Sequence, residues 1–203
     1  MSVPTHNTQP IAIIGMECRL PGADSVDAFW SNIRHGVSSL GPVSEERLNR
    51  ALYYNPTVGI VNRTYTDLGG IIEYRPVDRN VCPITDEWEN QYDVAHLNLC
   101  EVASRACLNA RIDPRHFPVR HTGVYVGSTT SGAMGSEMVV ATNLPETLKT
   151  FENIVPENLR GQKLSEHFNH LIKKISTKTR QRQFDGSPFT GANCAASLIA
   201  QVL

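Results

Sequence analysis

A cysteine among small residues near the end of the printed sequence is the first candidate for chemistry. Cys194 lies in the segment Gly191–Ala200, where a glycine comes before it and two alanines follow it. The glycine permits a sharp turn, and the alanines begin a helix with little steric bulk. The sulfur would then lie at a helix N-terminus, where unpaired N–H groups and the helix dipole favour a thiolate. The same N–H groups could hold the oxyanion that forms when a thioester is attacked.

A purely structural role for this cysteine is the alternative. A cysteine among alanines is often a small buried hydrophobic residue, and the ten residues taken alone favour that interpretation. The choice between nucleophile and core thiol therefore depends on the rest of the chain.

The amino-acid composition limits which classes of protein this chain can belong to. The 203 residues are 40% hydrophobic and 19% charged, enough to bury the core of one ordinary domain or of part of a larger one. A formal net charge of -1 gives no electrostatic reason to expect nucleic acid as the main partner. Residues 1–10 form a polar tail, and the apolar run after them is too short for a signal peptide or a membrane span. We expect a cytoplasmic protein without membrane contact.

The remaining cysteines and histidines predict neither a disulfide scaffold nor a metal site. Five cysteines are an odd number and form no CxxC pair, so reduced thiols are expected. His167 and His170 lie on a predicted helix over Gly161–Ser176, turned away from its apolar face and without a third ligand nearby. The loop Gly127–Ala133 lacks the lysine of a phosphate-binding loop, which excludes a nucleotide site of that type.

Hydrophobic patterning predicts alternating strands and helices. The continuous apolar runs Ile11–Ile14 and Thr122–Gly127 are typical of buried strands. Between them, Asp24 or Ser25 can cap a helix that ends at Gly36 and whose apolar face consists of Val26, Phe29, Trp30 and Ile33. Residues 37–70 are polar and rich in turn formers, and they predict a long irregular excursion.

The clearest helical period covers Asp93 to Ala110. One face of this predicted helix is apolar and small, with Leu99, Val102, Ala103, Ala106, Cys107 and Ala110. The opposite face is polar, with Asn98, Glu101, Arg105 and Asn109. Cys100 and Cys107 are expected to be core thiols.

Four of these segments together resemble β-ketoacyl synthase domains, above all those of modular polyketide synthases and polyunsaturated-fatty-acid synthases. The segments occur in the order of that family, and they are Ile11–Gly22 followed by a Phe-Trp helix, Asp93–Pro114, Thr122–Gly127 and Gly191–Ala200. Two stretches depart from the family pattern. Val94-Ala95-His96-Leu97 replaces its Pro-Gln-x-Arg, and Gly191-Ala192-Asn193 replaces its Asp-Thr-Ala.

The resemblance implies an α/β, thiolase-like fold, a mixed sheet between helix layers, of which this chain holds the first half. The tail 1–10 would precede a half-domain over 11–203, the amino-terminal piece of a longer synthase. Cys194 would attack an acyl thioester on the phosphopantetheine arm of an acyl carrier protein, and a malonyl-type extender would then condense with the acyl-enzyme. Cys18 is not the nucleophile in this family, so packing is its expected role.

Other consequences of the resemblance concern cofactors and partners. No bound cofactor is implied, and the complete enzyme would be a homodimer. The histidines that steer decarboxylation belong to the second half of such domains, so none of the seven in this chain is assigned a catalytic role. The basic run Lys173–Arg182 is interpreted as a solvated helix end, with a landing patch for an acidic carrier protein as the minority alternative.

Two other functions stay open at this point. A ketosynthase-like fragment could be catalytically silent and serve subunit pairing only. A cysteine hydrolase is the weaker alternative, because no motif places a histidine as its base.

Overall fold

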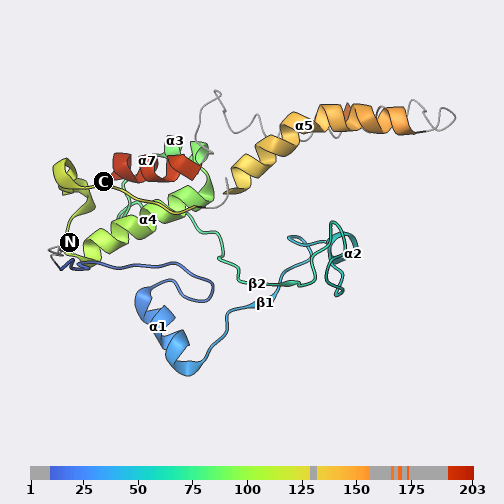
Figure 1. Cartoon of the computed structure of the whole chain (residues 1–203). Coiled ribbons are helices and arrows are strands. Elements are labelled where there is room, and N and C mark those ends of the chain that lie inside the picture. The colour runs from blue at the N-terminus through green and yellow to red at the C-terminus, as the bar shows by residue number, and fades with distance from the viewer. Residues whose placement is uncertain (1–9, 129–131, 156–165, 167–168, 171–172, 174–191) are drawn as a thin grey trace, which may run out of the picture. The chain divides into compact units, whose positions relative to one another are not determined.

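The computed structural model describes residues 10–128, 132–155, 166, 169–170, 173 and 192–203. Contacts divide the chain into two compact units, and Figure 1 labels the helices and strands. The first contains Met1–Pro76 and Val102–Asp113, and the second contains Val77–Glu101 and Pro114–Leu203. The long helices are α1 (Val26–His35), α4 (Val94–Asn109), α5 (Gly132–Ile154) and α7 (Ala192–Val202). The short elements are α2 (Arg50–Tyr53), α3 (Asp86–Gln91), the strands β1 (Gly41–Pro42) and β2 (Leu68–Gly69), and 3-10 turns at Pro114–His116 and Val119–His121.

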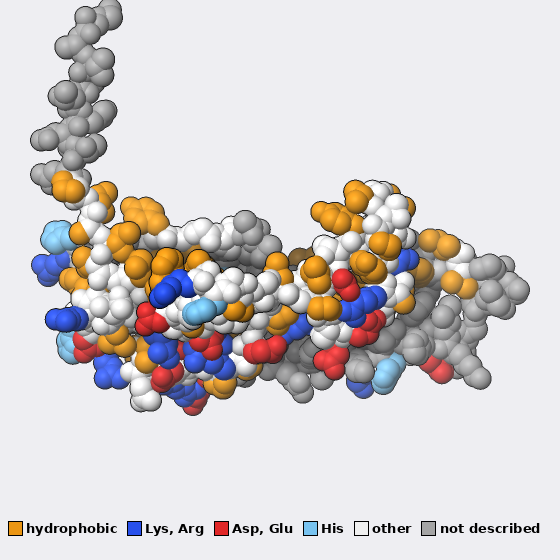
Figure 2. Space-filling view, turned by 90° about the horizontal axis from the view of Figure 1, so that it is seen from below, with side chains coloured by type: hydrophobic (Ala, Val, Ile, Leu, Met, Phe, Trp, Pro, Cys, Tyr) orange, Lys and Arg blue, Asp and Glu red, His pale blue; other side chains and the backbone are white. Residues whose placement is uncertain are grey.

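Helix α1 has both predicted ends. The Ser25 hydroxyl accepts a hydrogen bond from the Ala28 N–H at 3.2 Å, and Gly36 ends the helix in the left-handed conformation with φ 64°. Its predicted apolar face is nevertheless exposed, because α1 contains no buried residue. Phe29, Trp30 and Ile33 are among the hydrophobic side chains on the surface, a side-chain class that Figure 2 colours orange.

The predicted irregular excursion is confirmed over residues 37–70. Its regular structure is limited to α2 and to the antiparallel pair β1–β2, with Gly41 opposite Gly69. Arg50 holds the excursion together, because its guanidinium donates to the Asp67 carboxylate at 2.9 Å and to the Val43 carbonyl at 2.5 Å.

Neither predicted buried strand forms. Ile11–Ile14 and Thr122–Gly127 carry no strand hydrogen bonding, and Ile11 and Tyr125 are each 95% exposed. A strand needs a neighbouring strand to receive its backbone groups. Across the described part of the chain, β1–β2 is the whole of the named sheet structure. The mixed sheet between helix layers therefore stays a prediction.

Beyond Ile14, the N-terminal segment packs against the C-terminal half of α4 within the first unit. The Met16 N–H donates to the Asn109 side-chain oxygen at 3.1 Å. A Cβ at Gly15 would lie 2.3 Å from the Ala106 carbonyl oxygen, so only glycine fits this approach.

The core of the second unit forms where α7 lies beside α3 and the first turns of α4 (Figure 1). Its buried apolar side chains come from segments far apart in sequence, and they are Val77, Cys82, Ile84, Tyr92, Leu97, Cys100, Cys194, Ala195, Leu198, Ile199 and Val202. Among the described helices, none is long and apolar enough to cross a membrane.

Helix α4 matches its predicted range but buries a different face. The buried positions are Asp93, which caps it, and His96, Leu97, Cys100, Glu101, Ser104 and Cys107. The expected core thiols Cys100 and Cys107 are confirmed. Glu101 was predicted to face outward and is 2% exposed, because its carboxylate accepts a hydrogen bond from the Asp78 N–H at 3.4 Å. That contact comes from a distant loop, which helical periodicity cannot anticipate.

Candidate active site

Cys194 occupies the first turn of a helix, as its sequence context predicts. It is the third residue of α7, which begins at Ala192. The first N–H groups of an α-helix have no partner within the helix and carry its partial positive charge. The predicted turn at Gly191 lies outside the described residues.

The thiol of Cys194 is buried. Its residue is 6% exposed, and its helix neighbours Ala195 and Leu198 are at 1% and 0%. An apolar setting disfavours a thiolate, whereas the helix N-terminus favours it.

Tyr92 lies within electrostatic range of Cys194. It follows α3 directly and is 5% exposed. Burial raises the pKa of the Tyr92 hydroxyl, and negative charge on Cys194 and then on Cys100 raises that pKa further. Tyr92 was missed at the sequence level, where only its four-residue spacing from Trp88 could have indicated a packed aromatic pair.

Burial favours the thiol form of three other cysteines. Burial strongly raises the pKa of Cys100, and the charge of Cys82 adds to it. Burial likewise raises the pKa of Cys107, and burial followed by the charge of Glu17 raises that of half-buried Cys18. These three fit packing roles better than a nucleophilic one.

The histidines stay without an assigned role. His170 is exposed, as predicted, whereas His167 lies outside the described residues. His96 is buried on α4. In the part of the chain with a described structure, no group of three or more histidine, cysteine or acidic side chains could hold a metal ion. Lys173 is exposed, and the rest of the basic run to Arg182 is not described.

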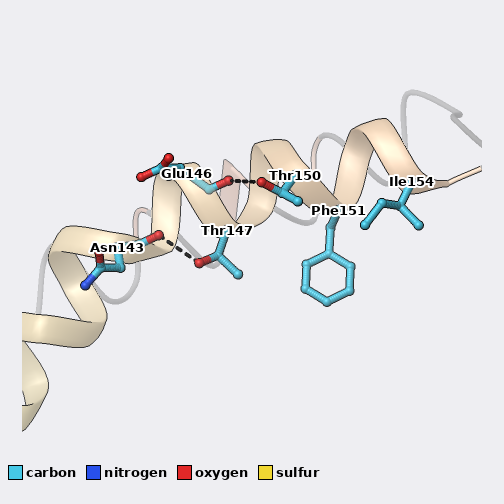
Figure 3. Close-up of a pocket in the computed structure, with 6 residues that line it drawn as sticks. All are labelled: Asn143, Glu146, Thr147, Thr150, Phe151 and Ile154. Atoms are coloured by element: carbon cyan, nitrogen blue, oxygen red, sulfur yellow. Dashed lines mark hydrogen bonds between the residues drawn. The ribbon is translucent and has the colours of Figure 1, made fainter.

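Two surface hollows are lined by residues other than Cys194. One of about 310 Å³ in the first unit is bordered by Arg19, whose guanidinium donates to the Glu73 carbonyl at 2.7 Å and lies 3.6 Å from the Asp24 carboxylate. The other, about 290 Å³, follows one side of α5 (Figure 3). There the Thr147 and Thr150 hydroxyls donate to carbonyls of their own helix at 2.9 and 3.0 Å, beside exposed Phe151. In both hollows, polar side chains already make hydrogen bonds to backbone carbonyls of the protein.

Comparison with known proteins assigns the chain to a protein family. The family model described as "Beta-ketoacyl synthase, N-terminal domain" matches residues 8–162, and the chain belongs to this family. The resemblance drawn from the four motifs is thereby confirmed. The matched range ends before α7, so it does not include Cys194.

Individual relatives are large polyketide synthases. The chain is 34% identical over 126 residues to the highly reducing polyketide synthase cnsI of Penicillium expansum, covering 61% of this chain and 5% of that protein. It is 30% identical over 130 residues to the partially reducing polyketide synthase men1 of Menisporopsis theobromae, covering 61% of this chain and 5% of that protein. The polyketide synthase ThaG of Burkholderia thailandensis is 37% identical over 70 residues, which cover 34% of this chain and 1% of that protein. The chain thus spans a small fraction of the curated relatives it matches.

Proposed function

We propose that this chain is part of a condensing enzyme that joins acyl thioesters by decarboxylative Claisen condensation in polyketide or fatty-acid biosynthesis. Cys194 is its nucleophile. The observation that carries the proposal is the position of Cys194 in the first turn of α7, within a chain of the ketosynthase N-terminal family. Four other thiols are present, and the pKa of Cys18, Cys100 and Cys107 is raised by burial.

In the first stage the Cys194 thiolate attacks the carbonyl carbon of an acyl thioester carried on the phosphopantetheine arm of an acyl carrier protein. A sulfur–carbon bond forms, and the carrier thiol leaves and takes up a proton. N–H groups of the first turn of α7 stabilise the oxyanion. In the second stage a malonyl-type extender loses carbon dioxide, and its carbanion displaces the cysteine as a new carbon–carbon bond forms.

The proposal includes a thiolase-like architecture, a homodimer and a cytoplasmic location, with no bound cofactor. The exposed apolar segments Ile11–Ile14 and Thr122–Gly127 are its strand-forming parts. Continuous apolar runs of this kind are typical of strands buried on both faces of a sheet. They pair when neighbouring strands of a complete ketosynthase lie beside them.

Acylation of the full chain by a short acyl thioester tests this function. We expect mass spectrometry to find the acyl group on Cys194 and not on the other four cysteines. Cys194→Ala should abolish labelling, whereas the matched variant Cys100→Ala, which removes a buried thiol from the same unit, should retain it. Equal labelling at Cys18 or Cys100 would show that the nucleophile is wrongly assigned.

A catalytically silent ketosynthase-like subunit is the second candidate. The observation in its favour is the 6% exposure of Cys194. In that case Cys194 would react with an alkylating reagent no faster than half-buried Cys18 at neutral pH. A nucleophile instead reacts faster than Cys18 because part of it is already thiolate.

A further inference from the structure

The hollow bordered by Arg19 belongs to the first unit, whereas Cys194 belongs to the second. Its walls are the turn at residues 19–24, the first turn of α1 through Ala28, and the segment 71–75. Its volume of about 310 Å³ is in the range of small-molecule sites in proteins. Condensation through Cys194 makes no use of this hollow, so its ligand is a separate question.

Short hydrogen bonds hold the walls of the hollow in one arrangement. Leu20 and Ala23 exchange two backbone hydrogen bonds, at 2.8 and 2.9 Å, which close the turn. The Asn32 side-chain amide donates to the Gly22 carbonyl at 2.9 Å and so ties this turn to α1. A cavity that is already formed loses little free energy to ordering when a ligand binds.

Two arginines line the hollow. The Arg19 side chain is 6% exposed, and its guanidinium joins two walls because it donates to the Glu73 carbonyl at 2.7 Å. Arg75 supplies the second guanidinium, and its Nε is also buried. Guanidinium groups bind carboxylates and phosphates with paired N–H donors, so this lining favours an anion.

The acidic side chains of the lining oppose this preference only in part. The Asp24 carboxylate lies 3.6 Å from the Arg19 Nε, but its side chain is 70% exposed. Glu73 is exposed as well. Water and salt screen exposed charges more strongly than buried ones, so the buried guanidinium of Arg19 outweighs them inside the hollow.

Most of the remaining lining is apolar. It includes Ala23, which is 4% exposed, and the side chains of Leu20, Ala28, Ile71 and Ile72. Apolar surface of this kind favours hydrocarbon over water. A ligand that fills the hollow therefore combines an anionic group with an apolar part.

We propose that this hollow binds a small organic anion, a carboxylate or phosphate attached to a short apolar chain. Arg19 and Arg75 hold the anionic group, and the aliphatic side chains cover the apolar part. Asp24 competes with the ligand for Arg19. The proposal is independent of the role of Cys194, because every lining residue belongs to the first unit.

Backbone-amide chemical shifts of the full chain, followed by NMR during titration, test this site. The probes are octanoate, octyl phosphate and octanamide, which has the chain of octanoate without its charge. With at least one of the two anions we expect saturable shifts at Ala23, Ala28 and Glu73 and a Kd of about 1 mM. Octanamide should bind about tenfold more weakly. Equal binding of octanamide, or no saturable shift at these residues with either anion, would overturn the proposal.

Charge variants in the hollow have expected effects of opposite sign. Arg75→Gln should weaken binding of the anion about tenfold. Asp24→Asn removes the competing carboxylate and should tighten binding about threefold, while Ser25 still caps α1. Arg34→Gln removes an exposed charge in the last turn of α1 and should leave the affinity unchanged.

A folded Arg75→Gln variant with the affinity of the wild type would show that the anion binds elsewhere. The comparison of octanoate with octanamide uses the natural chain, so it decides the proposal even where a variant does not fold.

Discussion

At the scale of single residues, the cysteine thiols of the second unit lie in different surroundings. Cys82 and Cys100 are fully buried, whereas Cys194 is buried in the first turn of a helix, where N–H groups are available to a charge. Three chemically identical side chains can therefore have different roles. Position relative to helix α7 distinguishes them, and burial alone does not.

The buried thiols predict a loss of stability in alkaline solution. The pKa of Cys100 is raised above its ordinary value of 9.0, so the unfolded chain loses this proton at a lower pH than the folded chain. The contribution is present below pH 9 and decreases as the pH rises above it. We expect the free energy of unfolding to fall there by up to about 1.4 kcal/mol per pH unit for this thiol.

Urea unfolding at a series of pH values from roughly 7 to 10, a range that includes the ordinary pKa of thiols, measures this effect. Cys100→Ala should make the alkaline slope shallower, whatever its effect on stability at neutral pH. Equal slopes in the variant and the wild type would show that Cys100 does not carry the linkage.

At the scale of elements, α1 is defined by local signals and not by burial. Its Ser25 cap and Gly36 terminus are satisfied although none of its residues is buried. Helices of this length are marginal without tertiary packing, so each capping interaction contributes appreciably. The opposite holds for α4, whose buried face follows contacts such as that between Glu101 and Asp78.

Gly36→Ala should destabilise α1 by about 1 kcal/mol, because alanine is strained in the left-handed conformation. A Cβ there would meet nothing within 4 Å, so the effect isolates backbone strain. Unfolding followed by the fluorescence of Trp30 on α1 measures the change. Gly41→Ala, equally open and without a positive φ, should change stability by less than about 0.5 kcal/mol. Equal effects of the two substitutions would contradict the assigned cap.

At the scale of the whole molecule, many large apolar side chains of the described residues face solvent. They include Ile11, Ile13 and Ile14 from one predicted strand and Tyr125 from the other. Large exposed apolar areas mark interaction surfaces or instability in isolation. The chain spans 5% of cnsI, and the proposed ketosynthase would supply neighbouring strands to these segments.

The contact between the N-terminal segment and α4 gives a prediction at this scale. Gly15→Ala should lower the free energy of unfolding by about 1–3 kcal/mol, because the new methyl group would meet the Ala106 carbonyl oxygen at 2.3 Å. Chemical denaturation of the full chain measures the loss. Gly127→Ala, with open space around its Cβ, serves as the control. A Gly15 variant as stable as this control would show that the segment does not pack on α4.

Local sequence was sufficient to specify the family, the bounds of α1 and α4, and the placement of Cys194 in the first turn of a helix. These properties depend on nearest neighbours along the chain, such as caps, helical periodicity and motif order. Short-range patterns of residue types therefore determine these properties without any long-range contact.

Three other properties required the folded chain. They are which face of α4 is buried, that Ile11–Ile14 and Thr122–Gly127 remain unpaired, and how deeply Cys194 is buried. These depend on contacts between residues distant in sequence, such as Asp78 and Glu101. A hydrophobic pattern indicates that a segment can be buried. Which other segment covers it depends on the tertiary structure.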